Sequence, residues 1–135
     1  MGNYSKQRKE IINIIAQMSN IPNAEEIYFE VKKKNSSISR STVYRNLIYF
    51  VNSGILIQIP IPGGTDRYFY KKDERDYGFV ICKYCGIIQD FICDFNISDF
   101  QKNIFKQTGT SILKNEIIVK GVCEKCKFNN ERNEK

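Results

Sequence analysis

The stretch that decides the fold is residues 39–54, SRSTVYRNLIYFVNSG. Ser39 is a typical residue for the N-cap of a helix, and Gly54 is a typical residue for its end. Between them, apolar residues recur at the spacing of one helical face: Val43, Leu47, Phe50 and Val51. The pattern predicts an amphipathic α-helix.

The opposite face of this helix is polar and aromatic. It carries Ser41, Arg45, Ile48 and Asn52, and its flanks carry Thr42, Tyr44 and Tyr49. Such groups suit a helix that lies in the major groove of DNA, where Arg contacts guanine or phosphate and aromatic or apolar edges contact thymine methyl groups. An ordinary amphipathic helix with a solvated face has the same spacing, so the helix alone leaves both interpretations open.

The charge of the chain is unevenly distributed. The chain has 135 residues, of which 41% are apolar, enough for one ordinary domain or for two small domains that share a core. Residues 1–72 hold eleven Lys or Arg against five Asp or Glu, whereas residues 73–135 hold ten of each. The net charge of +6 therefore lies in the half that contains the predicted helix, which is typical of a protein that binds duplex DNA. A charge selected for solubility alone is the alternative.

The elements around the helix predict a winged helix-turn-helix domain over residues 1–72. Apolar periodicity predicts helices over residues 6–18 and 23–34, and Asn23 and Glu26 have the spacing of a capping box at the start of the second helix. A short turn then leads into the helix of residues 39–54, which is the helix-turn-helix layout. Strands are predicted over residues 55–61 and 67–71, joined by the turn PGGTD, as a basic wing.

A charged break over residues 72–76 predicts a domain boundary, with a small α/β domain over residues 77–135. Strands are predicted over residues 77–82 and 87–91 and within residues 111–122, and a helix over residues 96–108. The polar tail from Asn129 onward is expected to fray. The expected fold class is α+β.

Four of the five cysteines form two C-x-x-C pairs, Cys82 with Cys85 and Cys123 with Cys126. Four thiolates in this arrangement predict a tetrahedral structural zinc, one per chain, with no coordination position left for catalysis. A redox or disulfide pair and a rubredoxin-like iron site are the alternatives. Cys93 lies outside both pairs, and it is expected to be a small buried residue, with a redox-active thiol as the alternative.

The composition argues against some function classes. The chain contains no histidine, which is the commonest general base, so we do not expect an enzyme. It has no apolar run long enough to span a membrane and no signal-peptide pattern at its N-terminus, so a soluble cytoplasmic protein is expected.

Along almost its whole length the chain resembles the ferric uptake regulator family of bacterial metal-responsive and peroxide-responsive repressors. The resemblance rests on SKQR (residues 5–8), NAEEIY (23–28), STVYRNL (41–47) and the segments CKYCG and GVCEKC, which resemble that family's zinc motifs. It implies an N-terminal winged helix, a C-terminal dimerisation domain and a homodimer. It also implies a palindromic operator, read by the helix that contains Tyr44 and Arg45.

Members of this family carry a regulatory metal site near the hinge, built mainly from histidines and carboxylates. The matching positions here are Ile21, Phe69, Tyr77, Phe79 and Asp90. Only Asp90 could bind a metal, so the resemblance implies a degenerate site in which apolar side chains replace the sensor.

The sequence thus predicts a zinc-stabilised, dimeric winged-helix transcription regulator without the usual metal switch. Its expected contacts with DNA are made by Ser41, Thr42, Tyr44, Arg45, Tyr49 and Arg67, with Lys71 and Lys72 near the wing. Two alternatives remain: an iron–thiolate electron carrier, and a dimerisation partner that titrates another regulator without binding DNA.

Overall fold

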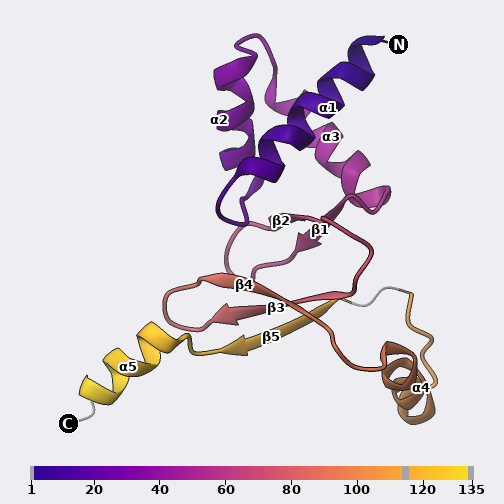
Figure 1. The fold of residues 1–135 in the computed structure, drawn as a ribbon, viewed down its shortest axis with the longest axis vertical. Coiled ribbons are helices and arrows are strands. Elements are labelled where there is room, and N and C mark those ends of the chain that lie inside the picture. Colours follow the sequence, from indigo (N-terminus) through magenta and orange to yellow (C-terminus); the bar gives the residue numbers. More distant parts are fainter. Residues whose placement is uncertain (1, 114–115, 134–135) are drawn as a thin grey trace. The chain divides into compact units, whose positions relative to one another are not determined.

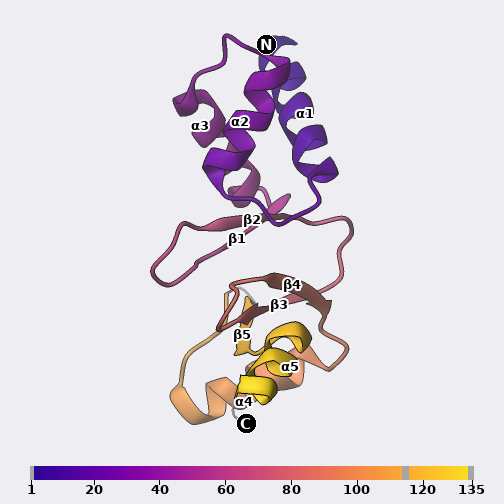
Figure 2. The ribbon, with the colours of Figure 1, turned by 90° about the vertical axis from the view of Figure 1, so that its left-hand side faces the viewer.

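The computed structural model describes residues 2–113 and 116–133, and the chain divides into two compact units, Met1–Asp73 and Glu74–Lys135. The first unit contains three helices followed by a hairpin (Figures 1 and 2). Their bounds are α1 Gly2–Gln17, α2 Ala24–Lys34, α3 Arg40–Asn52, β1 Leu56–Ile59 and β2 Arg67–Tyr70.

The predicted caps of α2 and α3 are confirmed. Asn23 Oδ1 accepts from the Glu26 backbone N–H at 2.8 Å, and the Asn23 N–H donates to Glu26 Oε1 at 3.0 Å, which completes the capping box. At α3, Ser39 Oγ accepts from the Thr42 N–H at 3.2 Å. Gly54, with φ of +80°, follows the end of α3 in the left-handed conformation that glycine adopts without strain.

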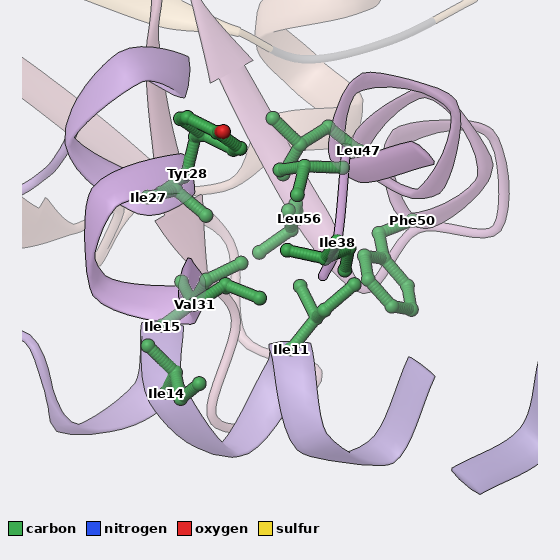
Figure 3. Packing of buried hydrophobic residues seen from close by; sticks show 11 residues of the cluster. Ile11, Ile14, Ile15, Ile27, Tyr28, Val31, Ile38, Leu47, Phe50 and Leu56 are labelled. Atoms are coloured by element: carbon green, nitrogen blue, oxygen red, sulfur yellow. The ribbon is translucent and has the colours of Figure 1, made fainter. Parts of the chain in front are cut away.

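The core of the first unit lies where the three helices meet β1 (Figure 3). The predicted apolar stripe of α3 faces this core, because Val43, Leu47 and Phe50 are all buried and Val51 is half-buried. The other helices and β1 contribute Ile11, Ile14, Ile15, Ile27, Tyr28, Val31 and Leu56. One face of α3 is therefore fixed by packing, and its other face is available to a partner.

The hairpin is shorter than predicted. β1 and β2 pair antiparallel from Leu56 opposite Tyr70 to Ile59 opposite Arg67, so the ladder ends before Pro60, which has no N–H to donate. α1 also differs from prediction, because it begins at Gly2 rather than at residue 6. In Figure 2 the hairpin lies at one end of the three-helix bundle.

The second unit is a three-stranded sheet with two helices. Its elements are β3 Tyr77–Cys82, β4 Ile88–Ile92, α4 Ile97–Thr108, β5 Ile117–Gly121 and α5 Glu124–Asn133. The strand order is β4-β3-β5, with β3 antiparallel to β4 and parallel to β5. Figure 1 shows α4 and α5 at opposite ends of these strands.

A glycine on the central strand of this sheet makes room for an aromatic ring. Gly78 lies opposite Phe91 in the pairing of β3 with β4, and a side chain at Gly78 would overlap the Phe91 ring. Only glycine allows the ring to lie across the strand in this way.

In the second unit the prediction for the last strand is confirmed and the prediction for the tail is wrong. The strand expected within residues 111–122 is β5, Ile117–Gly121, and residues 114–115 lie outside the described part. The tail that was expected to fray from Asn129 belongs to α5, which extends to Asn133. Its sequence EKCKFNNERN lacks an apolar stripe, so helical periodicity gives no signal there.

Candidate nucleic-acid interface and metal centre

The parallel pairing of β3 with β5 brings the two cysteine pairs together. Cys82 ends β3 and lies opposite Gly121, the last residue of β5, so Cys123 follows two residues later at the same edge of the sheet. The Lys83 N–H donates to the Gly121 carbonyl at 2.8 Å and continues the pairing past the strand ends. The two cysteine pairs, which have 37 residues between them in the sequence, therefore lie side by side.

The four sulfurs of these residues form one cluster, in which all Sγ atoms of Cys82, Cys85, Cys123 and Cys126 lie within 4.8 Å of one another. Cys85 Sγ and Cys123 Sγ are 3.7 Å apart. A tetrahedral zinc with Zn–S bonds of about 2.3 Å requires S···S distances of about 3.8 Å. The donor set and its spacing fit zinc, and four thiolates leave no position for a reactive water.

Backbone amide groups stabilise the thiolate form of Cys82. The N–H groups of Cys123 and Tyr84 each donate to Cys82 Sγ at 3.4 Å. Backbone hydrogen bonds from Cys123 foremost, then Cys85 and Tyr84, lower the pKa of Cys82 to about 6. The pKa of Cys126 is raised to about 12, because it donates a hydrogen bond to Cys123 and the other sulfurs lie close to it. Cys82 thus offers a thiolate to a metal, and metal binding would displace the proton of Cys126.

Cys93 lies outside this cluster and is 9% exposed. Burial, and then the charge of Asp76, raise the pKa of its thiol. A buried thiol with a raised pKa is a poor nucleophile, which favours the interpretation of Cys93 as a small packing residue over that of a redox site.

The outward face of α3 carries the predicted DNA-contacting side chains. Tyr44, Ile48 and Tyr49 are 39%, 61% and 43% exposed, and Ser41 and Arg45 are also exposed. The side chains near the start of the helix form a local network: Ser39 Oγ lies 3.1 Å from Ser41 Oγ and 2.9 Å from Thr42 Oγ1. Arg45 Nη2 donates to Thr42 Oγ1 at 3.3 Å, one helical turn away.

Two residues that the sequence did not single out hold the aromatic side chains of this face. The Tyr44 hydroxyl donates to Glu25 Oε2 of α2 at 3.1 Å. The guanidinium of Arg8 in α1 lies 3.6 Å from the centre of the Tyr49 ring, a cation–π contact. No motif marks these partners, because they come from other helices and only the packing of α1 and α2 on α3 brings them close.

Arg67, the predicted contact from the wing, is held by α2 and the segment before it. Its Nη1 lies 2.9 Å from Glu26 Oε1 and donates to the Ile21 carbonyl at 3.2 Å. Its side chain is 33% exposed. Arg67 thus anchors β2 to the start of α2 and keeps part of its guanidinium at the surface.

The five positions of the predicted degenerate metal site lie in both units. In the first unit, Ile21 and Phe69 are half-buried. In the second, Tyr77 and Phe79 are buried on one face of β3, and Asp90, which is exposed, lies opposite Phe79 on β4. Over residues 2–113 and 116–133, the four cysteines are the one group of three or more Cys, Asp or Glu ligand atoms close enough to hold a metal. No helix in this described part is long and apolar enough to cross a bilayer.

The model of the ferric uptake regulator family matches residues 2–120. The peroxide operon regulator of Bacillus subtilis is 27% identical over 120 residues, which cover 89% of this chain and 81% of that protein. The crystal structure of the Campylobacter jejuni peroxide stress regulator superposes with a TM-score of 0.73 at 28% identity and covers 90% of both chains. A zinc-bound manganese uptake regulator superposes with a TM-score of 0.56 at 27% identity and 87% coverage of both chains.

Proposed function

Because this chain belongs to the ferric uptake regulator family, we propose that it is a DNA-binding transcription regulator that acts as a homodimer on a palindromic operator. The observation that carries this proposal is α3, whose apolar face is buried in the core and whose polar and aromatic face is exposed. The hairpin β1–β2 follows it directly, as the wing of a winged helix does. The +6 charge of the whole chain is confined to residues 1–72, the part that contains this motif.

The side chains of α3 have distinct proposed roles. Tyr44 contacts base edges, and Arg45 contacts a guanine or a phosphate. Ser41, Thr42 and Tyr49 extend the same surface, and Arg67 contacts the DNA backbone beside the wing, near Lys71 and Lys72. In a symmetric dimer the two α3 helices would lie about 34 Å apart, or a multiple of that distance, so that each reads one half-site.

Residues 77–135 are the proposed dimerisation domain. Several large apolar side chains of this unit remain exposed in the single chain, which supports burial against a second copy. They include Ile92 at 37%, Val119 at 46%, Val122 at 43%, Phe100 at 42% and Phe105 at 54% exposed.

A structural zinc is the proposed resident of the cysteine cluster. The spacing of the four sulfurs and the amide donors to Cys82 support it. Bound there, zinc would link the ends of β3 and β5 and the start of α5, and its role would be structural. The protein would not be an enzyme.

We further propose that no regulatory metal switches this protein. Of the five positions that match the family's sensor, Ile21, Phe69, Tyr77 and Phe79 offer no ligand that suits a divalent metal switch, and Asp90 alone cannot complete a site.

The test is a selection of binding sites from a pool of randomised DNA duplexes by the zinc-loaded full-length chain. We expect enrichment of one two-fold symmetric sequence, and a sedimentation mass of the free protein twice the 15.8 kDa of the chain. A dimer that enriches no sequence would instead be the partner that does not bind DNA. A red, iron-containing preparation with no affinity for duplex would be the electron carrier.

A further inference from the structure

Glu25, in the first turn of α2, connects two residues of α3. Arg40 Nη2 donates to Glu25 Oε1 at 2.6 Å, and Arg40 Nε lies 3.2 Å from both carboxylate oxygens. The Tyr44 hydroxyl uses the second oxygen, Oε2, at 3.1 Å. The Arg40 guanidinium also lies 4.7 Å from the centre of the Tyr28 ring. One carboxylate thus fixes a cation and a phenol on the proposed recognition helix.

The chemistry of a carboxylate settles which partner supplies each proton. The hydrogen bond from Arg40 lowers the pKa of Glu25, so this side chain is ionised at neutral pH and can only accept. Burial, and then the bond to Glu25, raise the pKa of Tyr44, so the phenol stays protonated. The Tyr44 proton therefore points at Glu25, and the phenol oxygen keeps only its lone pairs for a further partner.

Glu25 also lies beside the wing. Glu25 and Tyr44 line a pocket of about 330 Å³ together with the hairpin residues Gly64, Thr65, Asp66 and Tyr68 and the start of α2. The carboxylates of Glu25 and Asp66 disfavour a phosphate at this point, whereas a group that donates hydrogen bonds would be accepted there.

We propose that Glu25 determines the DNA specificity of this protein: it restricts Tyr44 to base edges that donate a hydrogen bond, and it keeps Arg40 from binding phosphates of any sequence. This inference rests on the proposed function. In the major groove the donors are the exocyclic amino groups of adenine and cytosine, whereas guanine and thymine present oxygen acceptors to which a committed Tyr44 hydroxyl cannot donate. Phosphate oxygens are acceptors too, so the Tyr44 hydroxyl cannot donate a hydrogen bond to the DNA backbone.

The Arg40 side chain is 56% exposed, so its charge could reach DNA if Glu25 did not neutralise it. Each phosphate that a cation neutralises adds about 0.9 to the slope of log affinity against log salt concentration. Glu25 therefore lowers the affinity for nonspecific duplex, which raises the ratio of specific to nonspecific affinity.

The first experiment measures the salt dependence of binding to a duplex of random sequence. We expect Glu25→Gln, which keeps an acceptor for Tyr44 but removes the charge, to steepen the slope by about 0.9. Adding Arg40→Gln should restore the wild-type slope, because Arg40 is the cation that was released. The matched control is Glu30→Gln, which removes the same charge from α2. Glu30 is 42% exposed, close to the 41% of Glu25, and it also forms an ion pair, with Lys33.

The second experiment tests whether the Tyr44 hydroxyl accepts a hydrogen bond from a base instead of donating one. In the duplex selected by the wild type, each adenine is replaced in turn by purine, and each cytosine by 2-pyrimidinone, analogues without the amino group. We expect one replacement per half-site to lower wild-type affinity about three- to tenfold, the range of a single net hydrogen bond. Tyr44→Phe should be insensitive to that replacement. Glu25→Ala, which frees the Tyr44 proton, should select guanine or thymine at that position more often than Glu30→Ala does.

The outcomes separate the two claims. If the wild type enriches no sequence, the proposed function fails and this inference falls with it. If the wild type enriches an operator but Glu25→Gln and Glu30→Gln have equal salt slopes, Glu25 does not restrain Arg40. If Glu25→Ala and Glu30→Ala select the same bases, or every amino-group deletion is tolerated, Glu25 does not direct Tyr44. Either result overturns the inference and leaves the proposed function intact.

Discussion

Tyr44 and Arg45 are neighbours on α3 but are held in different ways. Tyr44 is tied to Glu25 of another helix, whereas Arg45 donates to Thr42 of its own helix at 3.3 Å. We expect Tyr44→Ala and Arg45→Ala each to weaken binding to the selected duplex by about 1–3 kcal/mol if the lost contact is to a base. Fluorescence anisotropy on the selected duplex and on variants with single base changes measures this.

The same titrations, repeated at several salt concentrations, assign the kind of contact. A loss at Arg45 that is equal for all sequences, with a slope shallower by about 0.9, would place Arg45 on a phosphate. Asn13→Ala, which changes an exposed residue of α1, is the control. Wild-type affinity in both the Tyr44 and the Arg45 variants would mean that α3 does not read the DNA.

At the scale of an element, α3 gives a stability test in two adjacent residues. Leu47 is 1% exposed in the core, and Ile48 is 61% exposed on the outward face. We expect Leu47→Ala to lower the free energy of unfolding by about 2–5 kcal/mol, because it removes buried methyl groups and leaves a cavity. Ile48→Ala should change it by less than about 0.5 kcal/mol. Urea unfolding followed by circular dichroism distinguishes the two, and equal losses would mean that α3 is rotated about its axis.

The second unit gives a test by metal removal. We expect zinc at one equivalent per chain in the purified, reduced protein, and Cys85→Ser or Cys126→Ser should lose it. Since an incomplete ligand set frees the ends of β3 and β5, both variants should also lose the ordered structure of this unit. Elemental analysis and amide hydrogen exchange measure the two effects, with Cys93→Ser as the variant that keeps its zinc. A wild-type protein that is folded and dimeric without zinc would contradict this prediction.

The sequence predicts those elements whose ends and buried face are marked by local residue patterns. α3 has a capping serine, an apolar stripe and a terminal glycine, and its structure agrees with that pattern. α5 has no such stripe, so the sequence predicts no helix there. The apolar strand expected within residues 111–122 is found as β5, which pairs with Gly78 to Cys82 of β3. The cysteine cluster follows from spacing, whereas the contact of Glu25 with Tyr44 depends on how two helices pack, which no local pattern encodes.

At the scale of the whole molecule, the prediction concerns control of DNA binding by a regulatory metal. Since the five positions of the degenerate site hold one carboxylate, we expect operator affinity to be the same, within about threefold, before and after manganese or iron is supplied. The sample would be protein that retains its zinc and has been freed of weakly bound metal by a mild chelator. A rise of a hundredfold or more, about 2.7 kcal/mol of coupling, would reveal a sensor site that these residues do not suggest.

The pairing of β3 with β5 has a mechanical consequence. If a metal bound all four cysteines, a pull on the two termini of the chain would be transmitted from Cys82 to Cys126 through the metal–sulfur bonds. The 43 residues between them, which include β4, α4 and β5, would carry no load while those bonds hold. Since an extended chain spans about 3.5 Å per residue, a stretched molecule with an intact cluster would be shorter by about 150 Å than one without it.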